Sequence, residues 1–424
     1  MRRNIAKGGI FVDYDRLIEY HVHFMVEKDR LNELLLKLTE SRRSVFSKSD
    51  FISWVKKYGL TVGFNLTPTG NISTDSNSLK SFINTNYYGD EITNVAKLFA
   101  EYNYYASQDL MLPKIIQNHK PTGLQTEDGR RLTRLRPQVV TQNTGRFGLV
   151  EPAVMNLPRY MKDLVAAPKG WEIITADSGQ IEPKLIYGFF ISDPQIKKLI
   201  DVYGDAYYAV LHYCRMPMSD IRDRVMDFEP VEITDELKEL RQRLKNYGNG
   251  VMYGSTSNKE NDPLKQAYID RIGKHPLRIE WQNKLLAKLN AGQKEFPTLF
   301  GTPINIYKSD KYAKANNDEE RRLALEHCTI NNPIQGTAGD LMGFSLKASD
   351  DLLAAKAPNS WIVKFVHDEG QYCVHKSELD YVMEELSGHT AYNIEDVVQI
   401  FNEPKIGRTI NQDVVCSYNK LCDA

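Results

Sequence analysis

The sequence predicts an α+β fold, because helical patterns and apolar strands occupy separate stretches of the chain. Residues 13–41 carry apolar side chains at helical spacing with charged residues between them, and residues 80–120 and 236–256 have the same character. Residues 171–182 and 361–375 are instead apolar runs typical of buried strands. At roughly 150 residues per domain, a chain of 424 residues is long enough for two or three domains.

The composition is that of an ordinary globular protein. Hydrophobic residues make up 42% of the chain and charged residues 26%, which excludes a largely disordered protein. The 54 basic and 55 acidic side chains leave a net charge of −1, which excludes nucleic-acid binding over the entire surface but not a locally basic groove. The five cysteines include no CxxC pair, which argues against a zinc ribbon or a disulfide framework and favours the reducing cytoplasm. No apolar run approaches the roughly 20 residues that span a bilayer, so we expect no membrane association.

The first third of the chain predicts helices joined by a polar loop. Asp13 and Asp15 stand at the start of the first helical pattern, where aspartates cap unpaired backbone N–H groups. Residues 64–79 are rich in turn-forming residues and predict an exposed loop. Five arginines then fall within 130–146, a run that fits either a solvated face or a basic contact surface. Further along, residues 216–236 are acidic and predict a surface excursion.

Two aspartates lie where apolar strands end. Asp177 follows the apolar part of WEIITADSGQIE, and Asp368 lies at the turn within WIVKFVHDEGQYCVH. A carboxylate beside apolar strands needs a partner, because its desolvation is costly. If the strands are neighbours, the pair forms an oxygen-rich site suited to Mg²⁺, and two such ions can hold the attacking and leaving oxygens of a phosphoryl transfer. Aspartates at strand ends can also serve only to cap turns.

The helical stretch 236–256 carries two cations on one face. Arg241 and Lys245 are four residues apart, and Tyr253 follows about two turns later on the same face. A planar arginine fork and a lysine point charge can together bind a polyphosphate, while the tyrosine ring can meet a base. The alternative is a solvated helix whose tyrosine belongs to the core.

The stretch NNPIQGTAGDL offers further polar side chains. Pro333 and Gly336 predict a turn or a helix start. Asn331 and Gln335 could donate hydrogen bonds to base edges or sugars. No histidine has sequence neighbours that suggest a metal site, so the histidines are interpreted as structural.

Three motifs, in this order, resemble those of the polymerase portion of family A DNA polymerases, the DNA polymerase I type. DSGQIE at 177–182 is similar to motif A of that family, RQRLKNYGNGVMYG at 241–254 to motif B, and VHDE at 366–369 to motif C. The flanking segments that also resemble the family are GGIFVDYDRLIEY at 8–20, TGRFGLVEPAVMNLPR at 144–159 and NNPIQGTAGDL at 331–341. The resemblance covers nearly the whole chain.

The resemblance implies a right-hand polymerase fold with a helical thumb, an antiparallel-sheet palm and helical fingers. It also implies two Mg²⁺ ions bound by Asp177, Asp368 and the backbone carbonyl of Ser178. One ion would activate the primer 3′-hydroxyl and the other would hold the triphosphate. Lys245 and Arg241 would act in catalysis on the reacting and outer phosphates.

The resemblance further implies sites for the nucleotide and the DNA. Besides the two cations, the nucleotide would contact Gln180, Glu182, Asn249 and Tyr253. The primer–template duplex would contact Arg136, Arg146, Asn156, Asn331, Gln335 and His367. In the family, a hydrogen bond between the residues that match Glu182 and Tyr253 closes the space for a ribose 2′-hydroxyl. The match therefore favours deoxynucleotides.

The chain departs from the family pattern at several positions. Asn249 stands where an aromatic residue usually precedes the motif B glycine, although an alignment on Tyr247 is the alternative. Tyr207 stands where the family has a histidine that touches phosphate. In motif A, Ser178 follows the aspartate directly, and Pro183 after the glutamate is expected to delay the start of a helix.

The resemblance implies a DNA-directed DNA polymerase that adds dNTPs to a primer 3′-hydroxyl and releases pyrophosphate during replication. The alternatives are a single-subunit RNA polymerase or primer-synthesising relative, a two-metal nuclease, and a non-catalytic DNA-binding relative. The expected divisions are 1–126 for the thumb with the N-terminal edge of the palm, 127–182 for the first part of the palm, 183–300 for the fingers and 301–424 for the second part of the palm.

The expected partners are primer–template DNA and dNTPs, together with a separate exonuclease, helicase or processivity factor. The protein itself is expected to be a monomer. Because Met1 lies close to the segment that resembles the thumb, we expect no proofreading activity in this chain, as would suit a phage or another compact replicon.

Overall fold

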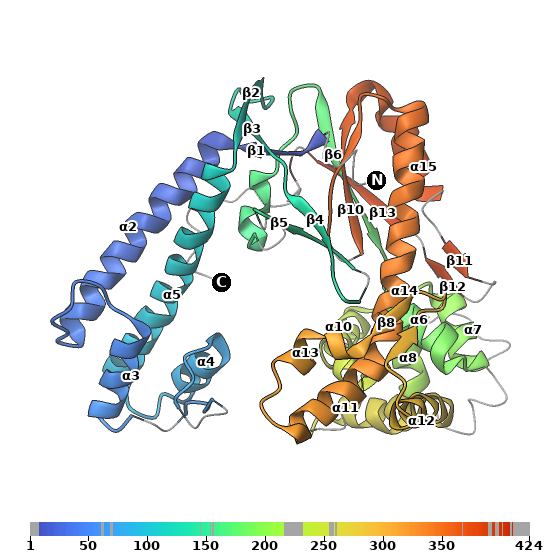
Figure 1. The fold of residues 1–424 in the computed structure, drawn as a ribbon, viewed down its shortest axis with the longest axis horizontal. Coiled ribbons are helices and arrows are strands. Elements are labelled where there is room, and N and C mark those ends of the chain that lie inside the picture. The colour runs from blue at the N-terminus through green and yellow to red at the C-terminus, as the bar shows by residue number, and fades with distance from the viewer. Residues whose placement is uncertain are drawn as a thin grey trace. The chain divides into compact units, whose positions relative to one another are not determined.

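The computed structural model describes residues 8–60, 63–67, 71–144, 146–152, 154, 157–215, 232–253, 258, 261–366, 368–388, 392–394, 398–400, 402–407 and 409. The chain divides into two compact units (Figure 1). The smaller unit comprises Phe11–Leu135 and Leu164–Lys169, and the larger unit comprises Met1–Ile10, Arg136–Asp163 and Gly170–Ala424.

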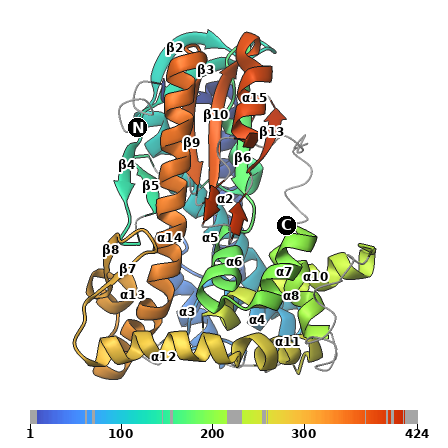
Figure 2. The same cartoon turned by 90° about the vertical axis from the view of Figure 1, so that its right-hand side faces the viewer.

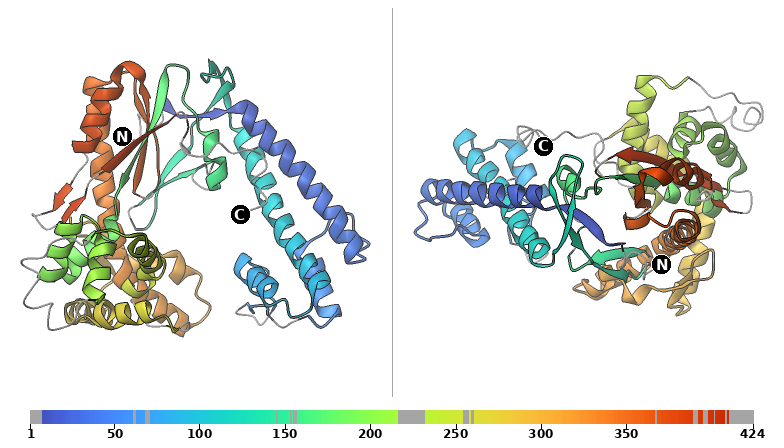
Figure 3. Two further views of the ribbon diagram at one scale, coloured as in Figure 1. Left: turned by 180° about the vertical axis from the view of Figure 1, so that it is seen from behind. Right: turned by 90° about the horizontal axis from the view of Figure 1, so that it is seen from above.

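The smaller unit is built on two long helices that lie side by side, α2 and α5 (Figure 3). Apolar residues at helical spacing, among them Leu17, Phe24 and Leu31, bury one face of α2. The helix begins at Tyr14 because the Asp13 carboxylate accepts the backbone N–H of Arg16 at 2.9 Å. The elements of this unit are β1 (Ile10–Asp13), α2 (Tyr14–Leu38), α3 (Lys48–Lys57), α4 (Ser76–Thr85), α5 (Asp90–Gln117), β2 (Lys120–Gln125) and β3 (Arg131–Leu135).

The predicted exposed loop at 64–79 is wrong in part. Residues 72–74 are buried, and α4 begins within the predicted loop. The polar residues cap this helix and join it to the preceding segment. Asp75 accepts the backbone N–H of Ser78 at 2.8 Å, and the Ser78 hydroxyl accepts the backbone N–H of Asn65 at 2.9 Å.

The arginines at the start of the basic run form ion pairs within the smaller unit. Arg131 donates from Nε to Asp15 at 2.8 Å, and Arg130 pairs with Glu19 at 3.3 Å. Asp15 is therefore an ion-pair partner rather than a helix cap, so the prediction of two capping aspartates is wrong for this residue. Of the two interpretations of the basic run, these ion pairs favour a solvated face over a basic contact surface for Arg130 and Arg131.

The larger unit contains a four-stranded antiparallel sheet in the order β13-β6-β10-β9. The predicted strand that carries Asp177 is β6 (Trp171–Ser178), and the predicted hairpin is β9 (Trp361–Val366) with β10 (Glu369–His375). The two edge strands are β9 and β13 (Asn402–Gly407). Helices α14 (Asp318–Lys356) and α15 (Leu379–Gly388) cover one face of the sheet, where Ile174, Phe365 and Leu346 pack together (Figure 2). The aspartates thus belong to neighbouring strand ends.

A group of helices follows β6 in the chain and has a core of its own. Tyr187, Leu244 and Ile272 are among its fully buried residues. Helix α6 begins at Ile181, so Pro183 does not delay the helix; the first N–H groups of a helix have no intrahelical partner, and proline loses little there. The group comprises α6 (Ile181–Leu185), η3 (Ile186–Ile191), α7 (Pro194–Tyr203), α8 (Ala206–Arg215), α10 (Asp235–Met252), α11 (Pro263–Tyr268), η5 (Ile269–Gly273) and α12 (Pro276–Asn290).

The prediction of a turn or helix start at 331–341 is wrong, because this stretch lies in the middle of α14. Pro333 is accommodated inside the helix, and the Thr337 hydroxyl donates to its carbonyl at 2.7 Å. Gly336 is required by close packing, since a Cβ at this position would lie 2.2 Å from the Ile304 side chain.

The remaining elements of the larger unit are short. They are β4 (Gln138–Thr141), β5 (Phe147–Val150), η2 (Arg159–Leu164), β7 (Glu295–Pro297), β8 (Pro303–Asn305), η6 (Ile306–Lys308), α13 (Asp310–Ala313), η7 (Lys376–Glu378), β11 (Tyr392–Ile394) and β12 (Val398–Ile400). Among the helices that the structure describes, none is both long enough and apolar enough to cross a bilayer.

Candidate active site

The two predicted aspartates lie at one end of the four-stranded sheet. Asp177 is exposed at the penultimate position of β6, and Asp368 lies in the turn between β9 and β10. The backbone N–H of Ser178 donates to the carbonyl of Asp368 at 2.8 Å, and Glu369 is opposite Asp177 in the register of β10 with β6. Antiparallel pairing therefore brings together two motifs that are far apart in the sequence.

Glu182 joins the C-terminal end of α10 to a residue near β5. The Tyr253 hydroxyl donates a hydrogen bond to Glu182, and the Arg146 guanidinium forms an ion pair with the same carboxylate. Gln335 of α14 also hydrogen-bonds to Tyr253. Burial raises the pKa of Tyr253 to about 12, so its hydroxyl is a donor at neutral pH.

Arg146 connects this group to the metal-site candidate. Burial lowers the pKa of Arg146, while Tyr253 and Asp368 act electrostatically in the opposite direction. Arginine nevertheless keeps its charge in proteins. A largely buried cation thus lies within electrostatic reach of a predicted metal ligand. It also contacts Glu182, which together with Tyr253 is predicted to exclude a ribose 2′-hydroxyl; we call this pair the sugar gate.

Helix α10 presents the two predicted phosphate-binding cations. Lys245 is exposed, and no ion pair or hydrogen bond joins its side chain to another described residue. Arg241, one turn earlier, forms an ion pair with Asp205 in which Nη2 lies 2.6 Å from the carboxylate. The Arg241 guanidinium also lies over the ring of Tyr207, at the position where the family has a histidine.

One face of α14 carries polar side chains near Tyr253. His327, Asn331 and Gln335 follow each other at intervals of four residues, which places them on one side of the helix. The Asn331 amide nitrogen contacts the His327 ring at 3.3 Å, and the ring of His327 lies 6.4 Å from that of Tyr253. The buried Oδ1 of Asn331 has no hydrogen-bond partner among the described residues.

Not every predicted site residue joins this group. Asn156 and His367 lie outside the described residues, and for Asn249 the structure describes the backbone within α10 but not the side chain. Arg136 is exposed, and no described contact links it to the other site candidates. The acidic stretch 216–236 is described only from residue 232 onward.

Two residues of the site were missed in the sequence. Asp205 precedes α8 directly, and His327 is four residues before Asn331. A helical interpretation of 318–341 would have found the histidine. Asp205 has no comparable signal, because its partner Arg241 is distant in the sequence.

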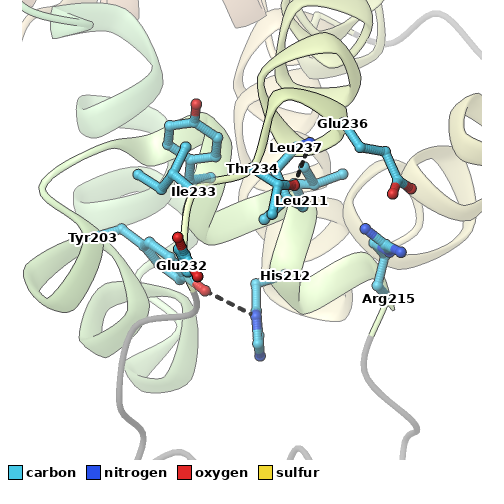
Figure 4. A pocket seen from close by; sticks show the side chains of 10 residues that line it. Tyr203, Leu211, His212, Arg215, Glu232, Ile233, Thr234, Glu236 and Leu237 are labelled. Atoms are coloured by element: carbon cyan, nitrogen blue, oxygen red, sulfur yellow. Dashed lines mark hydrogen bonds between the residues drawn. The ribbon is translucent and has the colours of Figure 1, made fainter.

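A separate pocket of about 470 Å³ lies beside α8 and the start of α10 (Figure 4). In this pocket Nδ1 of His212 is hydrogen-bonded to the Tyr203 hydroxyl at 3.0 Å. Burial and the nearby Arg215 lower the pKa of His212. The contact agrees with the structural role expected for this histidine, and none of the predicted site residues lines the pocket.

The donor set fits a hard divalent cation. Asp177 and Asp368 offer carboxylate oxygens at adjacent strand ends, and backbone carbonyls are close by. Within the described part of the chain, no group of three or more His, Cys, Asp or Glu residues has the arrangement of a metal site. Two carboxylates without a complete protein cage are typical of Mg²⁺ sites, since this ion keeps waters and binds substrate phosphates.

Comparison with known proteins agrees with this geometry. The family described as DNA polymerase family A matches residues 19–411. This chain belongs to DNA polymerase family A. DNA polymerase I of Pseudomonas aeruginosa is 26% identical over 294 residues, which cover 62% of this chain and 29% of that protein. DNA polymerase I of Aquifex aeolicus is 25% identical over 317 residues, covering 72% of this chain and 47% of that protein. The chain thus matches less than half the length of either relative.

A solved structure of the family confirms the predicted fold. The POL domain of Pol1 from M. smegmatis, in complex with DNA primer-template and dNTP, superposes with a TM-score of 0.75 at 20% sequence identity. The alignment covers 97% of this chain and 69% of that one. The α+β right-hand polymerase fold of the family therefore extends over nearly the whole chain.

Proposed function

We propose that this chain catalyses template-directed DNA synthesis, adding dNTPs to a primer 3′-hydroxyl with release of pyrophosphate. The observation that carries the proposal is the convergence of three motifs on one site: Asp177 and Asp368 at adjacent strand ends, with Glu182 hydrogen-bonded to Tyr253 of motif B. A nuclease has no need of a gate for the sugar or of a cationic helix for a triphosphate. Membership of family A supports the same activity.

Asp177, Asp368 and the Ser178 carbonyl would hold two Mg²⁺ ions. When bound, such ions stabilise the charge on the attacking and leaving oxygens of an in-line displacement. The exposed position of Asp177 leaves room for water and substrate oxygens around its carboxylate. Arg146 lies within electrostatic reach of Asp368, so its positive charge would offset part of the negative charge at the proposed metal site.

Arg241 and Lys245 would bind the triphosphate. They lie one turn apart on α10, so both can reach one polyphosphate. Lys245 would neutralise charge at the phosphate under attack, and Arg241 would bind the outer phosphates. Positioning and charge neutralisation account for most of the catalysis in phosphoryl transfer. Gln180 and Asn249 complete the proposed nucleotide site.

Arg146, Asn331 and Gln335 would contact the duplex from the minor groove, where contacts read pairing geometry more than sequence. Oδ1 of Asn331 is buried without a hydrogen-bond partner among the residues that the structure describes, which supports a ligand contact at this position. By the family resemblance, Arg136, Asn156 and His367 would also contact DNA. The solved relative holds DNA primer-template and dNTP, which supports both ligands for this chain.

The proposed subdomains follow the motifs. The helical smaller unit, which ends near residue 135, supports a thumb over about residues 1–126. The sheet strands β6, β9 and β10 support a palm formed by 127–182 and 301–424. The helices from α6 to α12 support fingers over 183–300.

Primer extension on a DNA template with Mg²⁺ tests the proposal, with dNTPs and rNTPs run in parallel. The wild-type chain should extend the primer with dNTPs, and Asp368→Asn should abolish extension while primer–template binding persists. Asp318→Asn is the matched control, because Asp318 is fully exposed at the start of α14. Extension with rNTPs alone would favour the RNA polymerase alternative. Cleavage of DNA without extension would favour the nuclease.

A further inference from the structure

Asp205 occupies a position between motif A and motif B. It directly precedes α8, and its Oδ1 accepts the backbone N–H groups of Tyr207 and Tyr208, each at 2.9 Å. These bonds satisfy two of the unpaired donors at the start of the helix. They also fix the orientation of the carboxylate, so its second oxygen has a defined direction.

The second oxygen of Asp205 binds Arg241 from the side of the guanidinium. Oδ2 accepts from Nε at 2.9 Å and from Nη2 at 2.6 Å. The guanidinium carbon lies 5.5 Å from the ring centre of Tyr207 and 5.3 Å from that of Tyr208. The two side chains are 23% and 16% exposed, so the ion pair is only partly screened by water. One carboxylate and two rings thus restrict the rotamers of Arg241.

Gln180 connects this pair to motif A. Its amide nitrogen donates to Oδ2 of Asp205, and its amide oxygen accepts the backbone N–H of Ala206 at 2.8 Å. The backbone of Gln180 is left-handed, with φ of 59°, which is uncommon for a residue other than glycine and is sustained only when the surroundings hold it. A continuous chain of bonds therefore runs from the turn after Asp177 through Asp205 to the phosphate-binding helix.

The side-on arrangement leaves part of Arg241 available. An arginine presents five N–H donors, and Asp205 uses those on the Nε and Nη2 edge. No hydrogen bond joins Nη1 to another residue in the described part of the chain. We propose that Asp205 is a positioning residue which, together with Gln180, holds Arg241 so that its remaining edge binds the outer phosphates of the incoming nucleotide. This inference rests on the proposed function, because it assumes that Arg241 binds a triphosphate.

Two opposing effects determine whether loss of the Asp205 carboxylate strengthens or weakens nucleotide binding. The Asp205 charge repels a triphosphate, whereas its hydrogen bonds hold Arg241 in one orientation. The repulsion is weakened because two backbone N–H groups, Gln180 and Arg241 already donate to this carboxylate. Among the described residues, no other group replaces the hydrogen bonds that orient Arg241. Without them the arginine side chain samples many rotamers, and fixing one of these on nucleotide binding costs conformational entropy. Loss of the carboxylate should therefore weaken nucleotide binding.

Steady-state incorporation of a single dNTP tests the inference. Asp205→Asn keeps an oxygen that can cap α8 but removes the charge that holds Arg241. We expect KM for the dNTP to rise about tenfold, with kcat changed by less than about threefold and the Kd for primer–template DNA unchanged. In an Arg241→Ala background the same substitution should change KM by less than about twofold, because Asp205 acts through Arg241.

Asp262→Asn is a closely matched control. Asp262 likewise caps a helix, α11, and likewise pairs with an arginine of α10, here Arg243 at 2.9 Å on an exposed surface. Its substitution should leave KM unchanged. Gln180→Ala should raise KM in the same direction as Asp205→Asn, which provides a second variant if the first does not fold.

The proposal is overturned if KM is unchanged or falls in Asp205→Asn, which would make Asp205 a competitor of the nucleotide. It is also overturned if the effects of Asp205→Asn and Arg241→Ala on KM multiply. Failure of the proposed function has a different signature, because the wild-type chain itself would then not incorporate dNTPs.

Discussion

The Glu182 carboxylate lies between a phenol and a guanidinium, and each of its oxygens has a different partner. Oε2 accepts from the Tyr253 hydroxyl, and Oε1 pairs with Arg146. Removal of this carboxylate therefore frees the tyrosine ring and also leaves a buried cation without its counter-ion. Both changes lie beside the position proposed for the nucleotide sugar.

Glu182→Ala should raise ribonucleotide incorporation. The small side chain no longer fills the space that a 2′-hydroxyl needs, and Tyr253 loses its hydrogen bond. We expect the ratio of kcat/KM for dNTP over rNTP to fall at least about tenfold, which corresponds to a loss of about 1.4 kcal/mol of discrimination in the transition state. Tyr253→Phe keeps the ring and should give a smaller decrease. An unchanged ratio in Glu182→Ala would remove Glu182 from the proposed gate.

Lys364 is a buried cation in the palm sheet. Its side chain is 1% exposed on β9, and Gln371 is its register partner on β10. Burial, and to a smaller extent the nearby Lys162, lower the pKa of Lys364 to about 8, while Glu369 acts in the opposite direction. A lysine within an apolar strand has a charge to desolvate, which reduces the stability of the folded state.

Lys364→Met should stabilise the protein at neutral pH. Below about pH 8 both folded and unfolded states carry the charge, so the burial penalty is fully present. Between about pH 8 and pH 10.5 the unfolded state binds more protons, so the stability of the wild type rises with pH. The shift corresponds to about 3 kcal/mol at pH 7. In thermal unfolding, Lys364→Met should therefore raise Tm more at pH 7 than at pH 10. Lys347→Met, at an exposed position, should change Tm little at either pH and serves as the control.

At this scale, the residues predictable from the sequence are those in recognisable motifs. Asp177, Glu182, Tyr253 and Asp368 fall within such motifs, and the structure brings them to one site. Asp205 could not be predicted in the same way, because its importance depends on contacts with Gln180 and Arg241 from other elements. Lys364 breaks the apolar pattern of β9, and only the fold shows that its side chain is buried.

At the scale of elements, helix α10 must hold its last turn firmly, because Tyr253 follows it directly. Arg278 of α12 donates from Nη2 to the carbonyls of Val251 at 3.1 Å and Met252 at 3.3 Å, and from Nη1 to that of Gly273. A cation near the C-terminus of a helix satisfies unpaired carbonyls and interacts favourably with the helix dipole. Arg278 is 4% exposed, so these carbonyls have little access to water.

Arg278→Ala should destabilise the protein and loosen the end of α10. Hydrogen bonds from a charged donor are worth roughly 1.5–3 kcal/mol each, and buried acceptors left unpaired add to the loss, so we expect at least about 2 kcal/mol. Hydrogen exchange should increase at the last turn of α10. Lys284→Ala on the same helix α12 removes an exposed ion pair with Glu280 and should cost under about 1 kcal/mol. Equal losses in the two variants would contradict a capping role for Arg278.

Helix α14 shows where element prediction fails. Pro333 and Gly336 are the residues that usually end helices, and they stand in the middle of this one. Tertiary packing overrides the local preference: the stretch is buried against β8, and Gly336 allows the close contact with Ile304. Helix α2 agrees with prediction because its burial follows the helical period of its apolar residues. Strands β6 and β10 agree because they are buried almost continuously, as expected of apolar runs inside a sheet.

At the scale of the whole molecule, a net charge of −1 requires that the proposed DNA binding rest on local basic surface. Many basic side chains already have acidic partners, as Arg131 has Asp15. Such a pair reduces the net charge that the arginine offers to a DNA phosphate. Arg136, five residues later, is exposed, and no carboxylate pairs with it in the part of the chain that the structure describes.

The salt dependence of primer–template affinity should separate these two arginines. Each phosphate contact releases condensed counterions, so affinity falls linearly with salt on logarithmic axes. Arg136→Ala should weaken binding and reduce the magnitude of that slope by about one, as expected for loss of one phosphate contact. Arg131→Ala should leave the slope unchanged, because Asp15 already compensates this charge. Fluorescence anisotropy with a labelled primer–template from 50 to 200 mM salt, a range over which such contacts change affinity strongly, measures both slopes. An equal reduction in the two variants would mean that the Asp15 ion pair opens on binding, and that the smaller unit also contributes phosphate contacts.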